Sequence, residues 1–281
     1  MNITRKRGKI LIDQEAYLET VLKRFSMENC RPADTPLPSG YLPVPNASPV
    51  NPQLRQQYQQ VIGSLLYLEL GTRPDIAFAV TKMATFAANP SQTHLDKALY
   101  ICRYLRGTSK YAIVYNGKEG EGLEAFTDSD WGTEPKDRKS ISGYFFKLAG
   151  GIISWQSRTQ KTVALSSTEA EYMAASDCAR QAAWMKQLLQ EIRIKMTPIP
   201  IAMDNQGSIF IAQNPVQNRR TKHIDIRYHY IRECISDKKV EVFFIPGTDN
   251  PADMFTKNTR SALSTQKFIK FRNTLGIEFY K

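Results

Sequence analysis

The sequence predicts an α/β protein that is built in two parts, a mainly helical region followed by a mixed α/β domain. In residues 54–107, apolar side chains recur at helical spacing. From residue 111 onward, short runs with strand character are separated by glycine-rich turns, and later by helical patterns. The length of 281 residues suits one large domain or two ordinary ones.

The chain begins with a hairpin expected over residues 3–12, with its turn at Gly8. Asp13 can cap a following helix, whose apolar positions share one face: Leu18, Val21, Leu22 and Phe25. Seven of the fifteen prolines then lie between Pro32 and Pro52. Because proline excludes regular structure, residues 32–53 are expected to form an extended connector.

Three helices are expected next, at residues 54–70, from Pro74 to Phe86, and from Ser91 to a stop at Gly107. His94, in the third of these helices, is expected at the surface. This block would complete the helical first part of the chain.

The second part alternates strands and helices. Strands are expected at 111–115, 122–128, 143–149, 151–156, 199–204 and 240–246, and helices at 167–192, 207–213, 221–236 and from Pro251. Three or more meandering strands followed by helix, strand, helix and strand predict a mixed α/β domain. Trp155 and Trp184 are expected in its core.

Composition narrows the function classes. The chain has no uncharged apolar run of the ~18 residues that a membrane helix needs. Its four cysteines are far apart and lack a CxxC pair, which indicates reduced thiols of an intracellular protein. The net charge is +11 and is spread over both halves of the chain. Such a basic surface favours a polyanionic partner, of which nucleic acid is the commonest.

Two aspartates stand where strands of the second part end. Asp128 ends the strand LEAFTD, and Asp204 follows the strand IPIAM. Ligands of α/β sheets gather at the carboxyl ends of strands, so these two carboxylates could share one site. The alternative is that each aspartate only terminates its strand or forms a turn.

Two further carboxylates are candidates for the same site. Glu169 fits a capping box at the start of the long helix, but Glu171 lies on the helix face that should press on the sheet. A buried carboxylate there needs a counter-charge such as a metal ion, unless it reaches solvent. Asp253 lies in the first turn of the last helix, where Asp249 or Asn250 can act as the cap. The helix dipole alone could explain Asp253.

Four carboxylates placed in this way in one α/β domain of a basic protein indicate a site that binds two Mg²⁺ ions and cleaves phosphodiesters. Several segments also resemble the ribonuclease H domain of copia-type LTR retrotransposon Pol polyproteins, in that family's order and spacing: AFTDSDWG, RKSISGYFFKLAGGIISWQSRTQKTVALSSTEAEYMAAS, MDNQGSIFIAQNP, RTKHIDIRYHYIRE and IPGTDNPADMFTK. Upstream, KRFSMENCRPADTPL, YQQVIGSLLYLELGTRPDIAFAV and ALYICRYLRGT resemble the end of the family's reverse transcriptase.

The resemblance implies a fold and its divisions. The fold would be a ribonuclease H-like mixed five-stranded sheet with flanking helices, preceded by a mainly helical thumb or connection region of the reverse transcriptase. The implied divisions are a palm- or thumb-like hairpin and helix at 1–31, the connector at 32–53, a helical connection region at 54–110, the ribonuclease H domain at 111–260 and a C-terminal helical tail at 261–281.

The resemblance also implies an activity, a metal-dependent endonuclease that hydrolyses the RNA strand of RNA–DNA hybrids during reverse transcription. The family's Asp-Glu-Asp-Asp quartet falls on the following residues, as catalytic groups and as ligands of two Mg²⁺ ions, with Mn²⁺ as a substitute: Asp128, Glu171, Asp204 and Asp253. The implied partners are the hybrid and the remainder of Pol, with no membrane. The implied location is the cytoplasm, in a virus-like particle, with the nucleus as a second option.

The sequence departs from the family's pattern at two points. Many ribonucleases H carry a histidine in the loop before the fourth carboxylate, but here that loop, PGTDNPA, has none. The chain also lacks any Asp-Asp dipeptide, so it carries no polymerase active site of that family.

Substrate contacts are expected from a basic segment and one aromatic residue. The basic segment supplies Arg219, Arg220, Lys222, His223 and Arg227, for which a solvated face is the alternative. His223 and His229 could instead be structural histidines. Trp131, beside the acidic residues, is expected to contact substrate. A non-catalytic nucleic-acid-binding module and a structural subunit of a reverse transcriptase assembly stay open as other functions.

Overall fold

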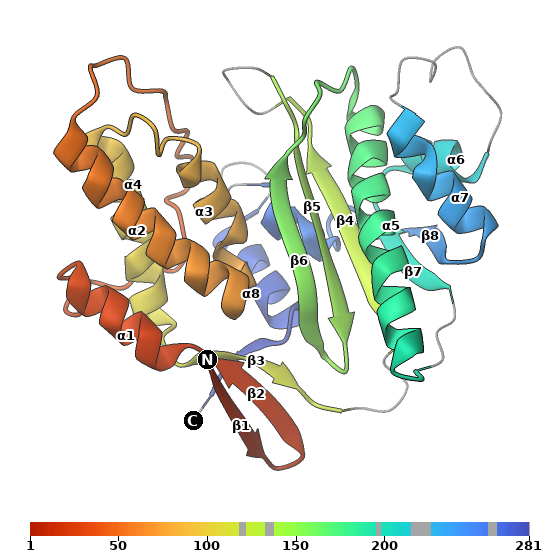
Figure 1. The fold of residues 1–281 in the computed structure, drawn as a ribbon, viewed down its shortest axis with the longest axis horizontal. Coiled ribbons are helices and arrows are strands. Elements are labelled where there is room, and N and C mark those ends of the chain that lie inside the picture. The colour runs from red at the N-terminus through yellow and green to blue at the C-terminus, as the bar shows by residue number, and fades with distance from the viewer. Residues whose placement is uncertain (118–121, 133–137, 195–197, 215–225, 258–262, 281) are drawn as a thin grey trace. The chain divides into compact units, whose positions relative to one another are not determined.

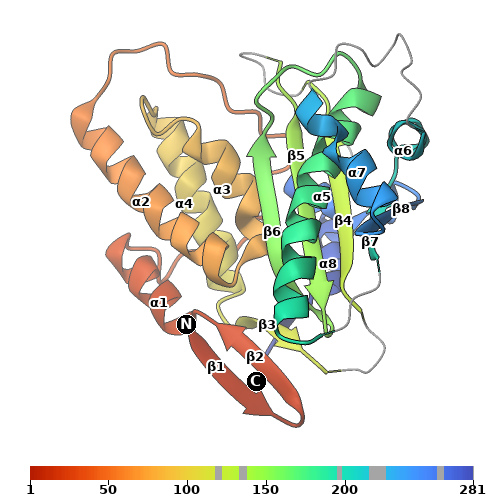
Figure 2. The same cartoon turned by 45° about the vertical axis from the view of Figure 1, so that its right-hand side comes forward.

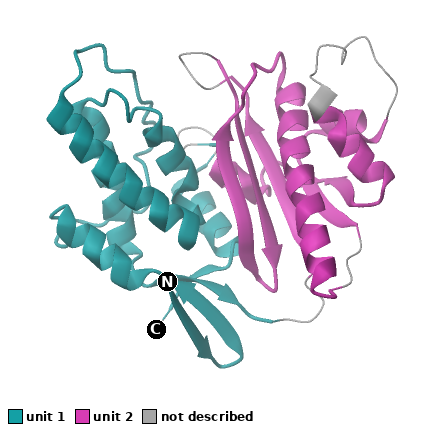
Figure 3. Cartoon of the chain, in the orientation of Figure 1, with its two compact units in different colours: residues 1–119, 257–281 teal, residues 120–256 magenta. Residues whose placement is uncertain are grey.

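The computed structural model describes residues 1–117, 122–132, 138–194, 198–214, 226–257 and 263–280. The chain forms two compact units, residues 1–119 with 257–281, and residues 120–256 (Figure 3). The second unit begins at residue 120, whereas the ribonuclease H domain was expected to begin at 111. Among the described residues, no helix has the length and apolar composition needed to cross a membrane.

The first unit contains the expected hairpin and helices (Figure 1). Strands β1 (Asn2–Lys6) and β2 (Lys9–Asp13) pair across a turn at Arg7 and Gly8, which both have positive φ, as a tight hairpin turn requires. Asp13 accepts a hydrogen bond from Glu15 N, 3.1 Å away, at the start of α1. The helices are α1 (Glu15–Arg24), α2 (Pro52–Gly71), α3 (Ala77–Ala84, after the 3₁₀ helix η1, Pro74–Ile76) and α4 (Gln92–Gly107).

A four-stranded sheet in the first unit was not expected. Strand β3 (Tyr111–Tyr115) pairs with β2 on one side and with β9 (Ile277–Phe279) on the other. The tail therefore contains a strand as well as the helix α8 (Thr265–Thr274), and the strand at 111–115 belongs to this sheet, not to the larger one. The apolar run YAIVY identifies a strand but does not identify its partners.

The connector has no helix or strand between residues 31 and 51, as predicted, yet parts of it are anchored. Ala33 N donates to the carbonyl of Arg103, and the side chains of Asn46 and Asn89 bond one another. Leu37 is 3% exposed. The connector thus has hydrogen-bonded anchors and a buried apolar side chain.

The expectation of a surface position for His94 is wrong. His94 is 1% exposed, its ring stacks on Phe86 at 4.1 Å, and its Nδ1 accepts a hydrogen bond from Ser91 N. The Ser91 hydroxyl in turn accepts from His94 N, so the two residues form a capping box for α4. Burial lowers the pKa of His94, which favours the neutral ring that this bond requires.

The second unit contains the predicted mixed five-stranded sheet with flanking helices (Figure 2). Its strand order is β6-β5-β4-β7-β8. Strands β4 (Glu124–Asp130), β5 (Ile141–Leu148) and β6 (Gly151–Thr159) pair antiparallel, whereas β7 (Ile199–Met203) and β8 (Val240–Phe244) continue the sheet in parallel from β4.

Different elements pack on the two faces of this sheet. The helix α5 (Ser167–Glu191) packs with α6 (Gln206–Gln213) and α7 (Tyr230–Ser236) over one face, in a core that contains Ala125 and Phe146. The other face carries Phe145, on which Phe255 of the 3₁₀ helix η4 (Pro251–Phe255) stacks at 5.7 Å. Because side chains alternate along a strand, Phe126 and Asp128 of β4 both belong to the η4 face.

Three local expectations need correction. The element that starts at Pro251 is a five-residue 3₁₀ helix. The described part of the polar helix is the 3₁₀ helix η3 (Ile226–His229) followed by α7. Trp184 is 55% exposed, not in the core, and lines an open groove of about 770 Å³ with Lys186 and Tyr230.

Candidate metal centre

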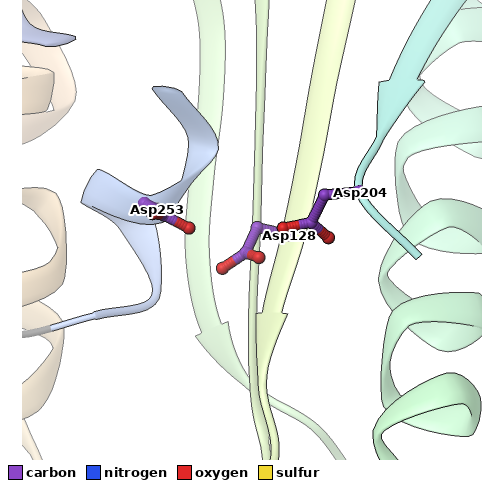
Figure 4. A group of neighbouring side chains, drawn as sticks. All are labelled: Asp128, Asp204 and Asp253. Carbon is purple, nitrogen blue, oxygen red and sulfur yellow. The ribbon is translucent and has the colours of Figure 1, made fainter. Parts of the chain in front are cut away.

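Three of the four predicted carboxylates converge in the second unit. Asp128, Asp204 and Asp253 each offer a carboxylate oxygen, and these atoms all lie within 4.8 Å of one another (Figure 4). Asp128 is 0% exposed and Asp253 is 1% exposed, while Asp204 is half-buried. They come from three elements that are distant in sequence, so the fold has assembled the group.

The parallel pairing of β4 with β7 brings the first two together. Phe126 lies opposite Ala202 in this ladder, so two residues further along Asp128 comes level with Asp204, just beyond the end of β7. Strand β4 continues to Asp130, and Asp128 is therefore not a strand terminator. Asn205, not Asp204, caps α6 by accepting a hydrogen bond from Ser208 N. The strand-terminator alternative therefore does not explain Asp128, and Asp204 is not needed as the cap of α6.

Asp253 is carried to the site by η4. Asn250 caps this element through Ala252 N, and its amide group donates to the carbonyl of Thr127 on β4 at 2.9 Å. Of the two capping candidates, Asn250 is therefore the one used. Its second bond attaches the start of η4 beside Asp128, which places Asp253 over the same strand.

Glu171 approaches β4 from the α5 face. It is 5% exposed, so it does not reach solvent, and its Oε1 accepts a hydrogen bond from Ser129 N at 3.0 Å. Glu169 has the expected structural role, since its N–H donates to the capping hydroxyl of Ser166 and its carboxylate accepts from Leu165 N. Glu171 thus lies next to the residue that follows Asp128, although it is outside the 4.8 Å group.

Two glycines at the site were missed by sequence reasoning. A Cβ atom on Gly247 would lie 2.8 Å from Asp204 Oδ2, so the backbone after β8 can approach this carboxylate only without a side chain. Gly143 lies opposite Asp128 in the β4–β5 ladder, and a Cβ atom there would lie 2.5 Å from Cβ of Phe255. Glycine in a strand signals such a close approach, but not its partner.

The donor set suits a hard divalent cation. Three carboxylates this close repel one another, and burial removes the water that would screen them, so the group is favourable only with a counter-charge or a shared proton. All the converging ligand atoms are oxygens, which Mg²⁺ and Mn²⁺ prefer. The residues present therefore fit a divalent metal ion.

The expected substrate residues are only partly within the description. Trp131 is 52% exposed, and its indole N–H donates to the carbonyl of Ala164, which orients the ring. Arg219, Arg220, Lys222 and His223 lie outside the described residues, as does the side chain of Arg227. His229 bonds the hydroxyl of Tyr172 at 3.0 Å, which agrees with the structural alternative.

Known proteins similar to this chain include transposon polyproteins. No family model matches. The retrovirus-related Pol polyprotein from transposon TNT 1-94 of Nicotiana tabacum is 40% identical over 265 residues, which cover 92% of this chain and 20% of that polyprotein. The corresponding polyprotein from transposon RE1 of Arabidopsis thaliana is 34% identical over 268 residues, which cover 95% and 18%.

Among solved structures, LC11-RNase H1, isolated from compost, matches 48% of this chain and 93% of its own, with 15% identity and a TM-score of 0.38. The chain spans about a fifth of the length of the curated polyproteins that it matches. With 34–40% identity over 92–95% of its residues, the chain is homologous to a segment of plant copia-type retrotransposon Pol polyproteins.

Proposed function

We propose that the second unit is a metal-dependent ribonuclease H that cleaves the RNA strand of RNA–DNA hybrids. The observation that carries this proposal is the convergence within 4.8 Å of Asp128 on β4, Asp204 just after the parallel strand β7, and Asp253 on η4. Such a group can bind the divalent cations that stabilise negative charge in phosphodiester cleavage. The net charge of +11 suits a polyanionic substrate. The Pol relatives agree with a role in reverse transcription.

The protein's own residues would act as follows. Asp128 and Asp253 hold their carboxylates in the protein interior, and Asp204 presents its carboxylate at the edge of the site. Glu171 is the proposed fourth ligand, beside Ser129. Two Mg²⁺ ions, when bound, would supply charge stabilisation to the attacking and leaving oxygens of the phosphodiester. Trp131 would contact the substrate next to these residues.

The first unit is proposed to be the end of a reverse transcriptase with its helical connection region. The basic segment Arg219, Arg220, Lys222, His223 and Arg227 is proposed to contact phosphates, and the remainder of Pol is the proposed partner. The cytoplasm, in a particle, is the proposed location, with the nucleus as the second option.

The test uses the full chain with a hybrid whose RNA strand is labelled. We expect cleavage with Mg²⁺ and none with EDTA, and we expect single-stranded RNA and double-stranded DNA to be left intact. The matched control is the Asp128→Asn variant, which should bind the hybrid without cutting it.

The other function classes predict different results. Salt-dependent binding of the hybrid without cleavage in Mg²⁺ would favour the non-catalytic binding module. Neither binding nor cleavage would favour the structural subunit. Cleavage that persists in EDTA would contradict the metal dependence.

A further inference from the structure

The hydroxyl of Thr256 lies inside the candidate metal centre. Thr256 is 0% exposed, and its Oγ1 donates a hydrogen bond to Oδ2 of Asp128. We propose that Thr256 is a positioning residue, which fixes the Asp128 carboxylate in the orientation that binds the metal ion. This inference rests on the proposed function, because it assigns Thr256 a role at the same site.

Thr256 is itself held in place by the attachment of η4 to the sheet. At the start of η4, the side chain of Asn250 bonds the carbonyl of Thr127. At its end, the hydroxyl of Ser157 on β6 donates to the carbonyl of Phe255 at 2.6 Å. The residue before Thr256 is thus bonded to one strand and stacked on another, which leaves the Thr256 hydroxyl little freedom to move.

Gly143 makes this contact possible. It lies directly opposite Asp128 in the β4–β5 ladder. A Cβ atom at this position would lie 2.8 Å from Cγ2 of Thr256 and 2.5 Å from Cβ of Phe255, and both distances are too short for carbon atoms. A side chain at residue 143 would therefore force Phe255, Thr256 or the strand itself to shift, and so disturb this contact.

The physical effect of the bond is to reduce the conformational freedom of a metal ligand. An ionised carboxylate has about four acceptor positions, so one bond from Thr256 leaves others for a cation. Without the hydroxyl, Asp128 could adopt orientations that point away from Asp204 and Asp253, and ion binding would have to restore the productive one. Outer partners of this kind commonly change metal affinity or activity by about 10–100-fold.

The test measures Mg²⁺ binding to the full chain by titration calorimetry, which is independent of turnover. Thr256→Val has nearly the same shape but no hydroxyl, and we expect it to bind Mg²⁺ about tenfold or more weakly. Thr256→Ser retains the hydroxyl and should bind within about twofold of the wild type. Circular dichroism checks that each variant is folded, and Thr256→Ala replaces the valine variant if that one does not fold.

Thr127→Val is the matched control. Thr127 is also 0% exposed and adjoins Asp128, but its hydroxyl donates to the carbonyl of Gly143 and not to a carboxylate. This variant should lose some stability and keep the wild-type Mg²⁺ affinity. Loss of affinity in Thr256→Val, with retention in Thr256→Ser and Thr127→Val, would support the proposal.

The contrary outcomes are distinct. If Thr256→Val or Thr256→Ala binds Mg²⁺ as tightly as the wild type does, the role assigned to Thr256 is wrong and the proposed function is unaffected. If Thr127→Val weakens binding as much as Thr256→Val, the effect is general to the buried strand and the proposal also fails. If the wild type binds no Mg²⁺ and cuts no hybrid, the proposed function itself is wrong.

Discussion

Replacing Asp204 by asparagine should stabilise the second unit in the absence of metal while it abolishes cleavage. Asp204 faces two other carboxylates whose ligand atoms lie within 4.8 Å of its own. Two unit charges at that separation repel by about 3 kcal/mol at an effective dielectric constant near 20. Asp204 is half-buried, so solvent screens part of this repulsion and limits what the substitution can recover. We therefore expect the free energy of unfolding to rise by about 1–4 kcal/mol.

Mg²⁺ should reduce the difference in stability between Asp204→Asn and the wild type. At a concentration about 100-fold above its dissociation constant, the ion would stabilise the wild type by about 2.7 kcal/mol, and the variant should gain much less. The three tryptophans, Trp131, Trp155 and Trp184, all lie in the second unit, so urea unfolding followed by tryptophan fluorescence reports on that unit alone. Each protein would be unfolded with EDTA and again with Mg²⁺.

Asp249→Asn is the control, because Asp249 is exposed in the loop before η4 and outside the carboxylate group. It should change neither the unfolding curve nor the response to Mg²⁺ by more than about 0.5 kcal/mol. Equal stability of Asp204→Asn and wild type in EDTA, with an equal gain in Mg²⁺, would show that the three carboxylates do not form one charged site.

Three other predictions follow from individual contacts. Glu171→Gln should abolish cleavage but keep the fold, because an amide oxygen can still accept the hydrogen bond from Ser129 N. The control is Glu169→Gln, at a similarly buried capping residue, and this variant should still cut the hybrid. Near-normal turnover of Glu171→Gln would refute the role of Glu171. Burial lowers the pKa of His94 from its ordinary value of 6.5, so near that pH the unfolded state binds more protons than the folded state. The stability that neutral His94 contributes should therefore be complete above pH 6.5 and should decline as the pH falls below it. Hydrogen exchange of α4 amides between pH 7.5 and 5.5 would measure this, and His94→Asn should respond less to pH. Limited proteolysis should cut first within residues 32–53, at the exposed stretch around Val44 and not at the buried Leu37. A connector that stays intact after other segments are cut would show that its anchors protect it from the protease.

The sequence by itself determined the local elements and the candidate carboxylates. Helix starts were predictable because their signals lie within a few residues, as with Ser91 before α4 and Ser166 before α5. Asp128 and Asp204 stood out because strand ends can be located from short apolar runs, and parallel strands bring such ends together. Glu171 stood out because helical spacing put a charge on an apolar face.

The tertiary structure alone decided which of these residues meet and what holds them. Thr256 and Asp128 are 128 residues apart in the chain, and Asn250 and Thr127 are 123 apart, so no local pattern encodes either bond. The same holds for β3, whose partners β2 and β9 come from opposite ends of the chain. It also holds for Trp184, which was expected in the core because its side chain is apolar, but which is exposed on α5. Periodicity specifies which face of an element is apolar, but only the assembled elements determine which surface covers that face, and hence which side chains come within bonding distance.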